Sequence, residues 1–213
     1  MKRIDVWLDP ISPFAYLAFE RLPVALEGLS YELHHRPVLF AGLLKQWGQK
    51  GPAEIEPKRA WTFRHVAWLA HSFGIEMQTP ASHPFNPLPL LRLLYATADA
   101  GQGPNRRACE LVMRHVWRGG GDAIDAGRLA ALHAQLAPRR DPNGDEVKAE
   151  LRAATDAAIA QGVFGVPTFG LDGRLFWGVD ALAMLRAALA GDAWFDGPDW
   201  AAAGIRPPGI ERR

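Results

Sequence analysis

The chain has 213 residues, of which 48% are hydrophobic and 22% are charged, so it can bury a large core in one domain or in a domain with an insertion. Its 24 basic and 23 acidic residues give a formal net charge of +1, and no apolar stretch is long enough to span a bilayer. We therefore expect neither nucleic acid nor a membrane as a partner. A single cysteine excludes an internal disulfide, and Asp5 and Asp9 interrupt the first apolar run too early for a signal peptide, which predicts a cytoplasmic protein.

The first segment, IDVWLDPISPFAYLAFERLPVAL, predicts a strand that turns directly into a helix. Apolar residues crowd positions 4–8, the turn Asp9–Pro13 follows, and a helical apolar pattern resumes at Phe14. Pro13 suits the first helical position, where a missing N–H costs nothing. Ser12 then lies at the helix N-terminus, where unpaired N–H groups and the helix dipole favour negative charge. The simplest interpretation of Ser12 is a helix cap, and the alternative is that it holds an anion.

The middle of the chain predicts one more strand and then only helices and loops. Residues 30–37 alternate as a strand does, and the adjacent His34 and His35 point to opposite faces without further ligands nearby, so we predict no metal site. Apolar periodicity between residues 40 and 161 predicts helices at about 59–73, 87–101, 105–117, 126–135 and 146–161. Cys109 lies on the apolar stripe of its helix, which predicts a buried core thiol.

Strands return only near the end of the chain. Residues 166–171 and 174–177 flank Asp172-Gly173, the pair that a two-residue type I′ hairpin turn requires. We expect Asp180 to cap a final helix and the Trp-, Pro- and Gly-rich tail from Asp192 to have no regular structure. The order β-α-β, helical block, α-β-β-α predicts one open α/β sheet. Such sheets bind ligands beyond the carboxyl ends of their strands, where Ser12 is predicted to lie.

Three motifs carry a resemblance to a known group of families. DPISPFAYLA at 9–18, GVFGVPTF at 162–169 and FWGVD at 176–180 resemble, in order, motifs of the kappa-class glutathione transferases and the 2-hydroxychromene-2-carboxylate isomerases. RPVLFAGLLKQWGQKGP is similar to a helix and loop of the isomerases, and the resemblance covers residues 2–190. It implies a DsbA-like α/β thioredoxin fold with a large all-helical inserted domain. The thioredoxin-like domain would comprise residues 1–39 and 160–195, the insertion residues 40–159, and the C-terminal tail residues 196–213.

The resemblance also implies a chemistry. Oxidoreductases of this fold place C-x-x-C where this chain has Ser12-Pro13-Phe14-Ala15. Disulfide exchange is therefore excluded, but Ser12 can donate a hydrogen bond to a borrowed thiolate. The glutathione-using relatives imply that this thiolate belongs to glutathione.

The remaining glutathione contacts are carried over from the same families. Val166, before an expected cis-Pro167, would offer its backbone N–H and C=O to the cysteinyl part. Asp180 and the backbone of Val179 would take the γ-glutamyl group, although Val179 and Ala181 depart from the Ser or Asn and the Arg of the relatives. Gln49 matches a polar contact.

Two questions about individual side chains stay open. Lys58 and Arg59 are both candidates for the glycyl carboxylate or for an anionic substrate. Phe14 and Trp47 could form the wall for an aromatic substrate, or belong to the core.

The resemblance predicts a glutathione-dependent cis–trans isomerase that converts 2-hydroxychromene-2-carboxylate, or a related compound of aromatic catabolism, to trans-o-hydroxybenzylidenepyruvate. A thiolate that adds to the conjugated system allows rotation, and elimination returns the thiol. The alternatives are a kappa-like glutathione transferase or peroxidase and a non-catalytic, chaperone-like or glutathione-binding protein. A homodimer is common among the relatives.

Overall fold

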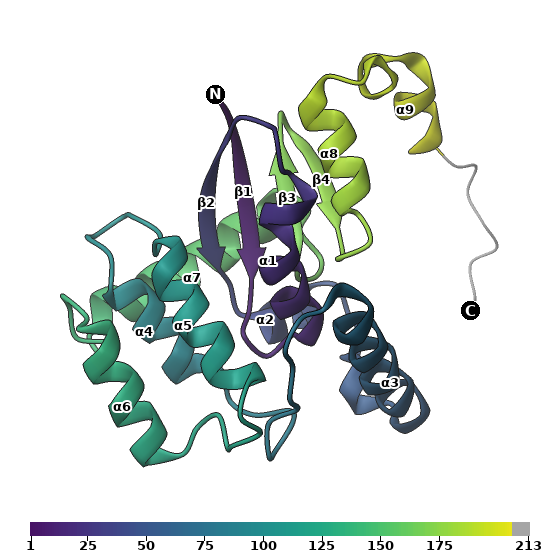
Figure 1. Cartoon of the computed structure of the whole chain (residues 1–213). Coiled ribbons are helices and arrows are strands. Elements are labelled where there is room, and N and C mark those ends of the chain that lie inside the picture. Colours follow the sequence, from purple (N-terminus) through teal and green to yellow (C-terminus); the bar gives the residue numbers. More distant parts are fainter. Residues whose placement is uncertain (206–213) are drawn as a thin grey trace.

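The computed structural model describes residues 1–205 and contains an α/β sheet interrupted by a helical block, as predicted (Figure 1). The strands are β1 (Lys2–Leu8), β2 (Tyr31–Pro37), β3 (Thr168–Leu171) and β4 (Arg174–Trp177). The helices are α1 (Pro13–Ala25), α2 (Phe40–Gln46), α3 (Glu56–Phe73), α4 (Leu88–Ala96), α5 (Arg106–Trp117), α6 (Ala126–Leu136), α7 (Asp145–Ala160), α8 (Leu182–Ala190) and α9 (Pro198–Ala203). Two 3-10 turns, η1 (Pro52–Glu54) and η2 (Ala193–Asp196), complete the described chain.

The four strands form one sheet in the order β2-β1-β3-β4. β1 is parallel to β2 and antiparallel to β3, so that Val6 lies between His35 and Phe169, and β3 pairs antiparallel with β4. The β3–β4 connection has positive φ at both Asp172 (50°) and Gly173 (77°), which confirms the type I′ turn. Strands from both ends of the chain therefore meet at the centre of the sheet.

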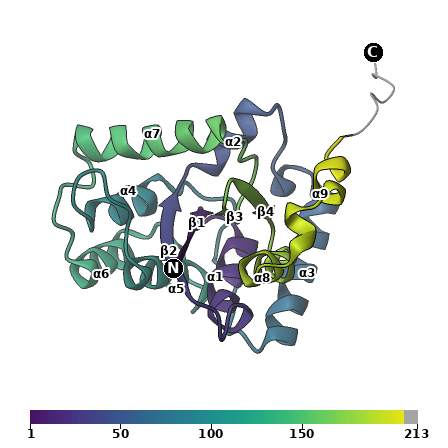
Figure 2. The ribbon, with the colours of Figure 1, turned by 90° about the horizontal axis from the view of Figure 1, so that it is seen from above.

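Helices cover both faces of the sheet (Figure 2). Ile4, Val6 and Leu8 of β1 point into a core shared with α1 and α8. Trp7 points the other way, toward a smaller cluster that includes Ala158 of α7. Because side chains alternate along a strand, those of β1 are divided between the layers on the two faces of the sheet.

The helical block lies at the carboxyl ends of β1 and β2 (Figure 1). Two of its aromatic side chains are tied to the strand ends: Trp117 Nε1 donates to the Pro10 carbonyl at 2.8 Å, and the Tyr95 hydroxyl donates to the Pro37 carbonyl at 2.8 Å. Cys109 is fully buried in this block, as predicted, and burial raises the pKa of its thiol. No helix within residues 1–205 is long and apolar enough to cross a membrane.

Helix boundaries show where local patterns were insufficient. α3 begins at Glu56, three residues before the predicted start, and α4 ends at Ala96 instead of near residue 101. The expectation that Asp180 caps the last helix was wrong, because the cap position of α8 is Ala181 and no side chain bonds there. Asp180 therefore keeps its carboxylate free of that role.

The tail also differs from the expectation of irregular structure. Asp192 Oδ1 accepts from Trp194 N at 3.0 Å and begins η2. Phe195 is buried, and Trp200 of α9 stacks on Phe176 of β4 with ring centroids 6.1 Å apart. These aromatic contacts hold the segment on the sheet, and residues 206–213 of the predicted tail lie outside the described part of the chain.

Candidate functional site

Ser12 caps α1 and lies at the carboxyl end of β1. Its backbone is extended (φ −88°, ψ 117°), and its Oγ accepts a hydrogen bond from Ala15 N at 3.2 Å, the geometry of an N-cap. The same Oγ donates to the Val166 carbonyl at 3.3 Å, across 154 positions of sequence. The predicted cap is confirmed, and the hydroxyl hydrogen faces a second segment of the site.

Hydrogen bonds join the three sequence motifs into one surface. Ser12 reaches Val166, the Val166–Pro167 peptide bond is cis, and Gly178 N donates to the Pro167 carbonyl at 2.9 Å. The turn before α1 therefore contacts the segment before β3, and that segment contacts the segment before α8. The sequence placed the motifs in order, and the fold brings them into contact.

Two backbone donors at this junction have no protein acceptor. Across residues 1–205, neither the Phe14 N–H nor the Val166 N–H donates a hydrogen bond to the protein. The first N–H groups of a helix lack intrahelical partners and, with the helix dipole, favour an anion. Ser12 Oγ bonds to the Val166 carbonyl and caps the helix to which Phe14 belongs, so both free donors lie in segments that meet at Ser12.

Asp180 lies beside the same junction, and its carboxylate is available. Gly178 has φ +98°, and a Cβ at this position would overlap with Asp180 Oδ1. Asp180 is exposed, and its carboxylate takes part in no ion pair or side-chain hydrogen bond in the described chain, whereas the Val179 side chain is buried. Val179 therefore offers a ligand no exposed side chain, whereas the Asp180 carboxylate can meet a cation.

Trp47 and Gln49 lie in the loop after α2. The Trp47 indole donates from Nε1 to the Val163 carbonyl at 3.0 Å and remains 45% exposed. Gln49 N donates to the Leu44 carbonyl at 2.9 Å, and its side chain is exposed. The structure thus brings Trp47 to the segment that leads to Val166, and within residues 1–205 the Gln49 side-chain amide has no hydrogen-bond partner.

Arg59 reaches the Ser12 turn through His83. Arg59 Nη2 donates to the His83 carbonyl at 2.7 Å, and His83 Nε2 lies 2.9 Å from the Ile11 carbonyl. Because a carbonyl only accepts, Nε2 carries the proton. Burial lowers the pKa of His83. Lys58 is exposed and forms no ion pair within the described residues.

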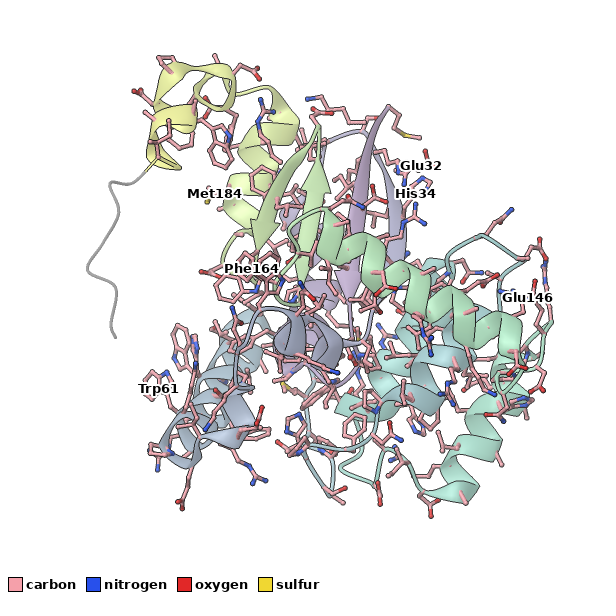
Figure 3. All side chains as sticks on the ribbon, turned by 180° about the vertical axis from the view of Figure 1, so that it is seen from behind. Glu32, His34, Trp61, Glu146, Phe164 and Met184 are labelled. Carbon is pink, nitrogen blue, oxygen red and sulfur yellow. The ribbon has the colours of Figure 1, made fainter. Side chains whose placement is uncertain are left out.

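Phe14 contacts an aromatic row on α3 that was not predicted. Its ring centroid lies 5.7 Å from that of His65, which stacks between Trp61 (6.1 Å) and Trp68 (6.5 Å). Trp61 and Trp68 are 64% and 62% exposed, and Trp61 projects from α3 (Figure 3). The spacing of i, i+4 and i+7 was the available sequence signal.

Asp9 was not among the predicted site residues. Its side chain is fully buried, Oδ1 accepts from Ile11 N at 3.0 Å and Oδ2 accepts from Phe40 N at 2.9 Å. Burial raises the pKa of this carboxyl to about 7, against the opposing effect of the two hydrogen bonds. Its place three residues before Ser12 was visible, but its burial was not.

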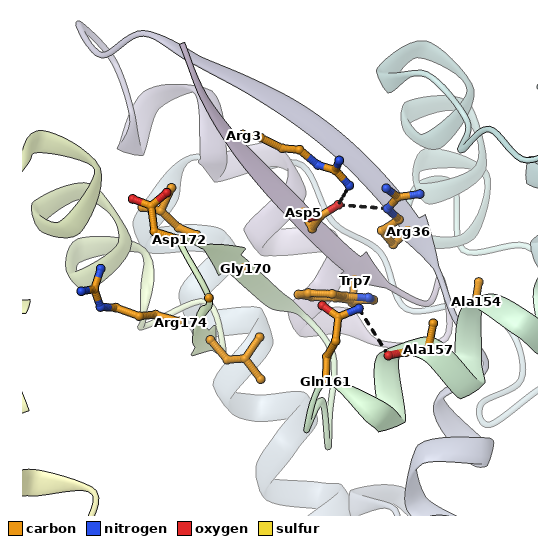
Figure 4. Close-up of a pocket in the computed structure, with 13 residues that line it drawn as sticks. Arg3, Asp5, Trp7, Arg36, Ala154, Ala157, Gln161, Gly170, Asp172 and Arg174 are labelled. Carbon is orange, nitrogen blue, oxygen red and sulfur yellow. Dashed lines mark hydrogen bonds and ion pairs between the residues drawn. The ribbon is translucent and has the colours of Figure 1, made fainter. Parts of the chain in front are cut away.

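A separate groove of about 880 Å³ lies where α7 faces the sheet (Figure 4). Its charged side chains are paired: Asp5 accepts from Arg3 at 2.7 Å and from Arg36 at 3.0 Å within the groove, whereas Asp172 lies 3.0 Å from Lys2 outside the lining. None of the predicted site residues lines it. The described residues contain no cluster of three metal-binding side chains.

Comparisons with known proteins agree with this architecture. The family model described as a DSBA-like thioredoxin domain matches residues 3–190. The chain is 28% identical to a 2-hydroxychromene-2-carboxylate isomerase of Sphingobium xenophagum (88% of this chain, 98% of the relative) and 27% identical to glutathione S-transferase kappa 1 of Rattus norvegicus (90% and 92%). A solved structure of a 2-hydroxychromene-2-carboxylate isomerase superposes with a TM-score of 0.77 at 23% identity, covering 91% of this chain and 97% of the other.

Proposed function

Because the chain belongs to the family of DsbA-like thioredoxin domains, we propose that it is a glutathione-dependent cis–trans isomerase of that fold. Its substrate would be 2-hydroxychromene-2-carboxylate or a related aromatic catabolite, and its product trans-o-hydroxybenzylidenepyruvate. The observation that carries the proposal is the Ser12 hydroxyl at the start of α1, bonded across the junction to Val166, together with the backbone N–H groups of Phe14 and Val166 that find no acceptor within residues 1–205. The named isomerase and transferase relatives support the choice of reaction.

The donor set fits a thiolate better than a disulfide-exchange site, because no cysteine stands at this turn. Bound glutathione supplies the chemistry that rotation needs: its thiolate adds to the conjugated system, so the double bond is single until elimination restores it. Ser12 would turn its hydroxyl from the Val166 carbonyl toward the sulfur, and the Phe14 N–H adds a second donor. Stabilising the thiolate in this way lowers the pKa of the thiol.

The other residues hold the rest of glutathione. Once Ser12 turns away, the Val166 carbonyl is free to accept from the cysteinyl N–H, while the Val166 N–H donates in strand fashion next to Pro167. Asp180 takes the γ-glutamyl ammonium, with the backbone of Val179 beside it. Gln49 and either Lys58 or Arg59 are the donors that we assign to the carboxylates.

The substrate would enter between Phe14 and Trp47. Both side chains have exposed or half-buried rings, and the Trp61–His65 pair of α3 continues the aromatic surface from Phe14. A planar aromatic carboxylate is the kind of ligand that such a surface, with Lys58 and Arg59 nearby, would accept.

We also propose that the protein is a cytoplasmic homodimer.

A spectrophotometric isomerase assay with and without glutathione tests the proposal. Turnover should require glutathione, and Ser12→Ala should lower kcat/KM by about 100-fold because a donor to the developing charge is lost. Ser72→Ala, at a serine of α3 whose hydroxyl donates to Leu69 of the same helix, is the matched control and should behave as wild type. Full turnover by Ser12→Ala with glutathione still bound would show that Ser12 does not activate the thiolate.

The second candidate is a kappa-like glutathione transferase or peroxidase, which the likeness to the rat enzyme favours. In this second candidate the same glutathione thiolate attacks a different electrophile. Conjugation of a generic electrophile without isomerase turnover would support it. Glutathione binding without either reaction would indicate a non-catalytic binding protein.

A further inference from the structure

The turn that carries Ser12 is held by its own backbone and by two side chains from distant segments. Asp9 O accepts from Ser12 N at 3.0 Å, Trp117 donates to the Pro10 carbonyl, and His83 donates to the Ile11 carbonyl. The Ile11 N–H is the remaining polar group at the apex of the turn. It donates to Asp9 Oδ1 at 3.0 Å.

The second oxygen of the same carboxylate leaves the turn. Asp9 Oδ2 accepts from Phe40 N at 2.9 Å, and Phe40 is the first residue of α2. One fully buried carboxylate therefore bridges the Ser12 turn and the start of the helix that leads to Trp47 and Gln49. Each oxygen has one backbone partner, so neither bond can be lost without leaving a buried oxygen or N–H unsatisfied.

No counter-charge shares this role. In the described chain Asp9 forms no ion pair, and its carboxylate is bonded to two backbone N–H groups. The indole of Trp117 and the imidazole of His83 bond to the carbonyls of the same turn. Arg59, the nearest cation in this network, is bonded to the far side of His83. A buried carboxylate without a cation is costly, so its presence needs a reason other than stability.

We propose that Asp9 is a positioning residue that fixes the Ser12 turn relative to α2. The group that faces the sulfur and the loop that carries Trp47 and Gln49 then keep one relative position. The functional part of this inference rests on the proposed binding of glutathione. The structural part does not.

Phe40 allows the bridge to be cut without changing Asp9. Phe40→Pro removes the N–H at the first position of a helix, where proline is tolerated, and Leu39 before it is already extended (φ −80°, ψ 105°). Phe40→Ala removes the same ring and keeps the N–H. Any difference between these two variants therefore reports the bond to Asp9.

Glutathione affinity, measured by calorimetry, is the first readout. We expect Phe40→Pro to bind glutathione about tenfold more weakly than Phe40→Ala, and Asp9→Asn to show a similar loss relative to wild type. The thiol pKa of bound glutathione, measured by thiolate absorbance, should rise in both, because the donors are no longer held in place. Asp5→Asn, at an aspartate of β1 on the groove side of the sheet, should match wild type in both measurements.

Amide hydrogen exchange of the unliganded protein is the second readout and does not depend on glutathione. Asp9→Ala should speed exchange at Ile11 and Phe40 by about tenfold relative to Asp5→Asn. Wild-type exchange rates there, or equal affinity and thiol pKa in the two Phe40 variants, would overturn the inference.

The two readouts separate the inference from the proposed function. A wild-type protein that binds no glutathione would defeat the proposed function, while exchange would still decide whether Asp9 holds the turn. If the Asp9 variants do not fold, the two Phe40 variants decide the question.

Discussion

At the residue scale, Asp9 makes the free energy of unfolding depend on pH in the direction opposite to that of a carboxyl with a lowered pKa. Burial raises its pKa to about 7, above the usual value of about 4 for an aspartate. Between these values the folded protein binds a proton that the unfolded chain releases. The contribution of Asp9 to stability is thus present at low pH and lost as pH rises through the folded pKa.

We predict that the free energy of unfolding of wild type falls by about 3 kcal/mol relative to Asp9→Asn between pH 4.5 and 7.5. Urea denaturation at several pH values measures this difference. Asp5→Asn should show almost no change over this range: burial raises the pKa of Asp5, but hydrogen bonds from Arg3 and Arg36 outweigh it and lower the pKa, so the stabilisation by Asp5 is lost only at more acidic pH. A difference between wild type and Asp9→Asn that does not change with pH would contradict the linkage.

At the scale of the element, α2 is a short helix whose start is completed from outside. It has seven residues and no side-chain cap of its own. The N–H of Leu39, its cap residue, donates to Thr155 Oγ1 of α7 at 3.1 Å, and the N–H of Phe40 donates to Asp9. So short a segment is not stable as a helix alone, so tertiary contacts decide that it forms.

We predict that Thr155→Val lowers the free energy of unfolding by about 1–3 kcal/mol, because a residue of nearly the same shape leaves the Leu39 N–H unpaired. Thr155→Ser keeps the hydroxyl and should cost less, although it loses a methyl group. Chemical denaturation of the two variants compares them directly. Equal losses would mean that the hydroxyl contributes nothing.

At the scale of the whole molecule, the helical block is part of the same folding unit as the sheet. Trp117 of α5 is fully buried and bonds to Pro10, 107 positions earlier in the chain. Cys109 and Val116 of the same helix lie in one core with Val6 of β1. Unfolding the block would therefore expose part of the core of the sheet.

We predict a single cooperative unfolding transition, coincident by circular dichroism and tryptophan fluorescence. Trp117→Phe should lower the whole transition by about 2 kcal/mol or more, through lost volume and an unpaired Pro10 carbonyl. Trp194→Phe, at a half-exposed indole of η2, is the control and should have a small effect. Two separate transitions would indicate that the block and the sheet unfold independently.

The accuracy of the sequence-based expectations follows the range of the interactions involved. Strand β1, the Ser12 cap and the Asp172-Gly173 turn depend on neighbours within a few residues, and all three were predicted. Asp180 was assigned to a cap because its residue type favours one, but the backbone begins α8 one residue later. The helical tail was missed because its order comes from Trp200 packing on Phe176.

The sequence by itself determined a strand that turns into a helix with Ser12 in place of a cysteine, and three motifs in the order of a thioredoxin fold. These features depend on residue type, periodicity and turn geometry, which act locally. Only the tertiary structure decided that Val166 meets Ser12, that Gly178 meets Pro167, and that Asp9 is buried between the turn and α2. Hydrogen-bond partners far apart in the chain, and a pKa set by exclusion of water, exist only once the layers have packed.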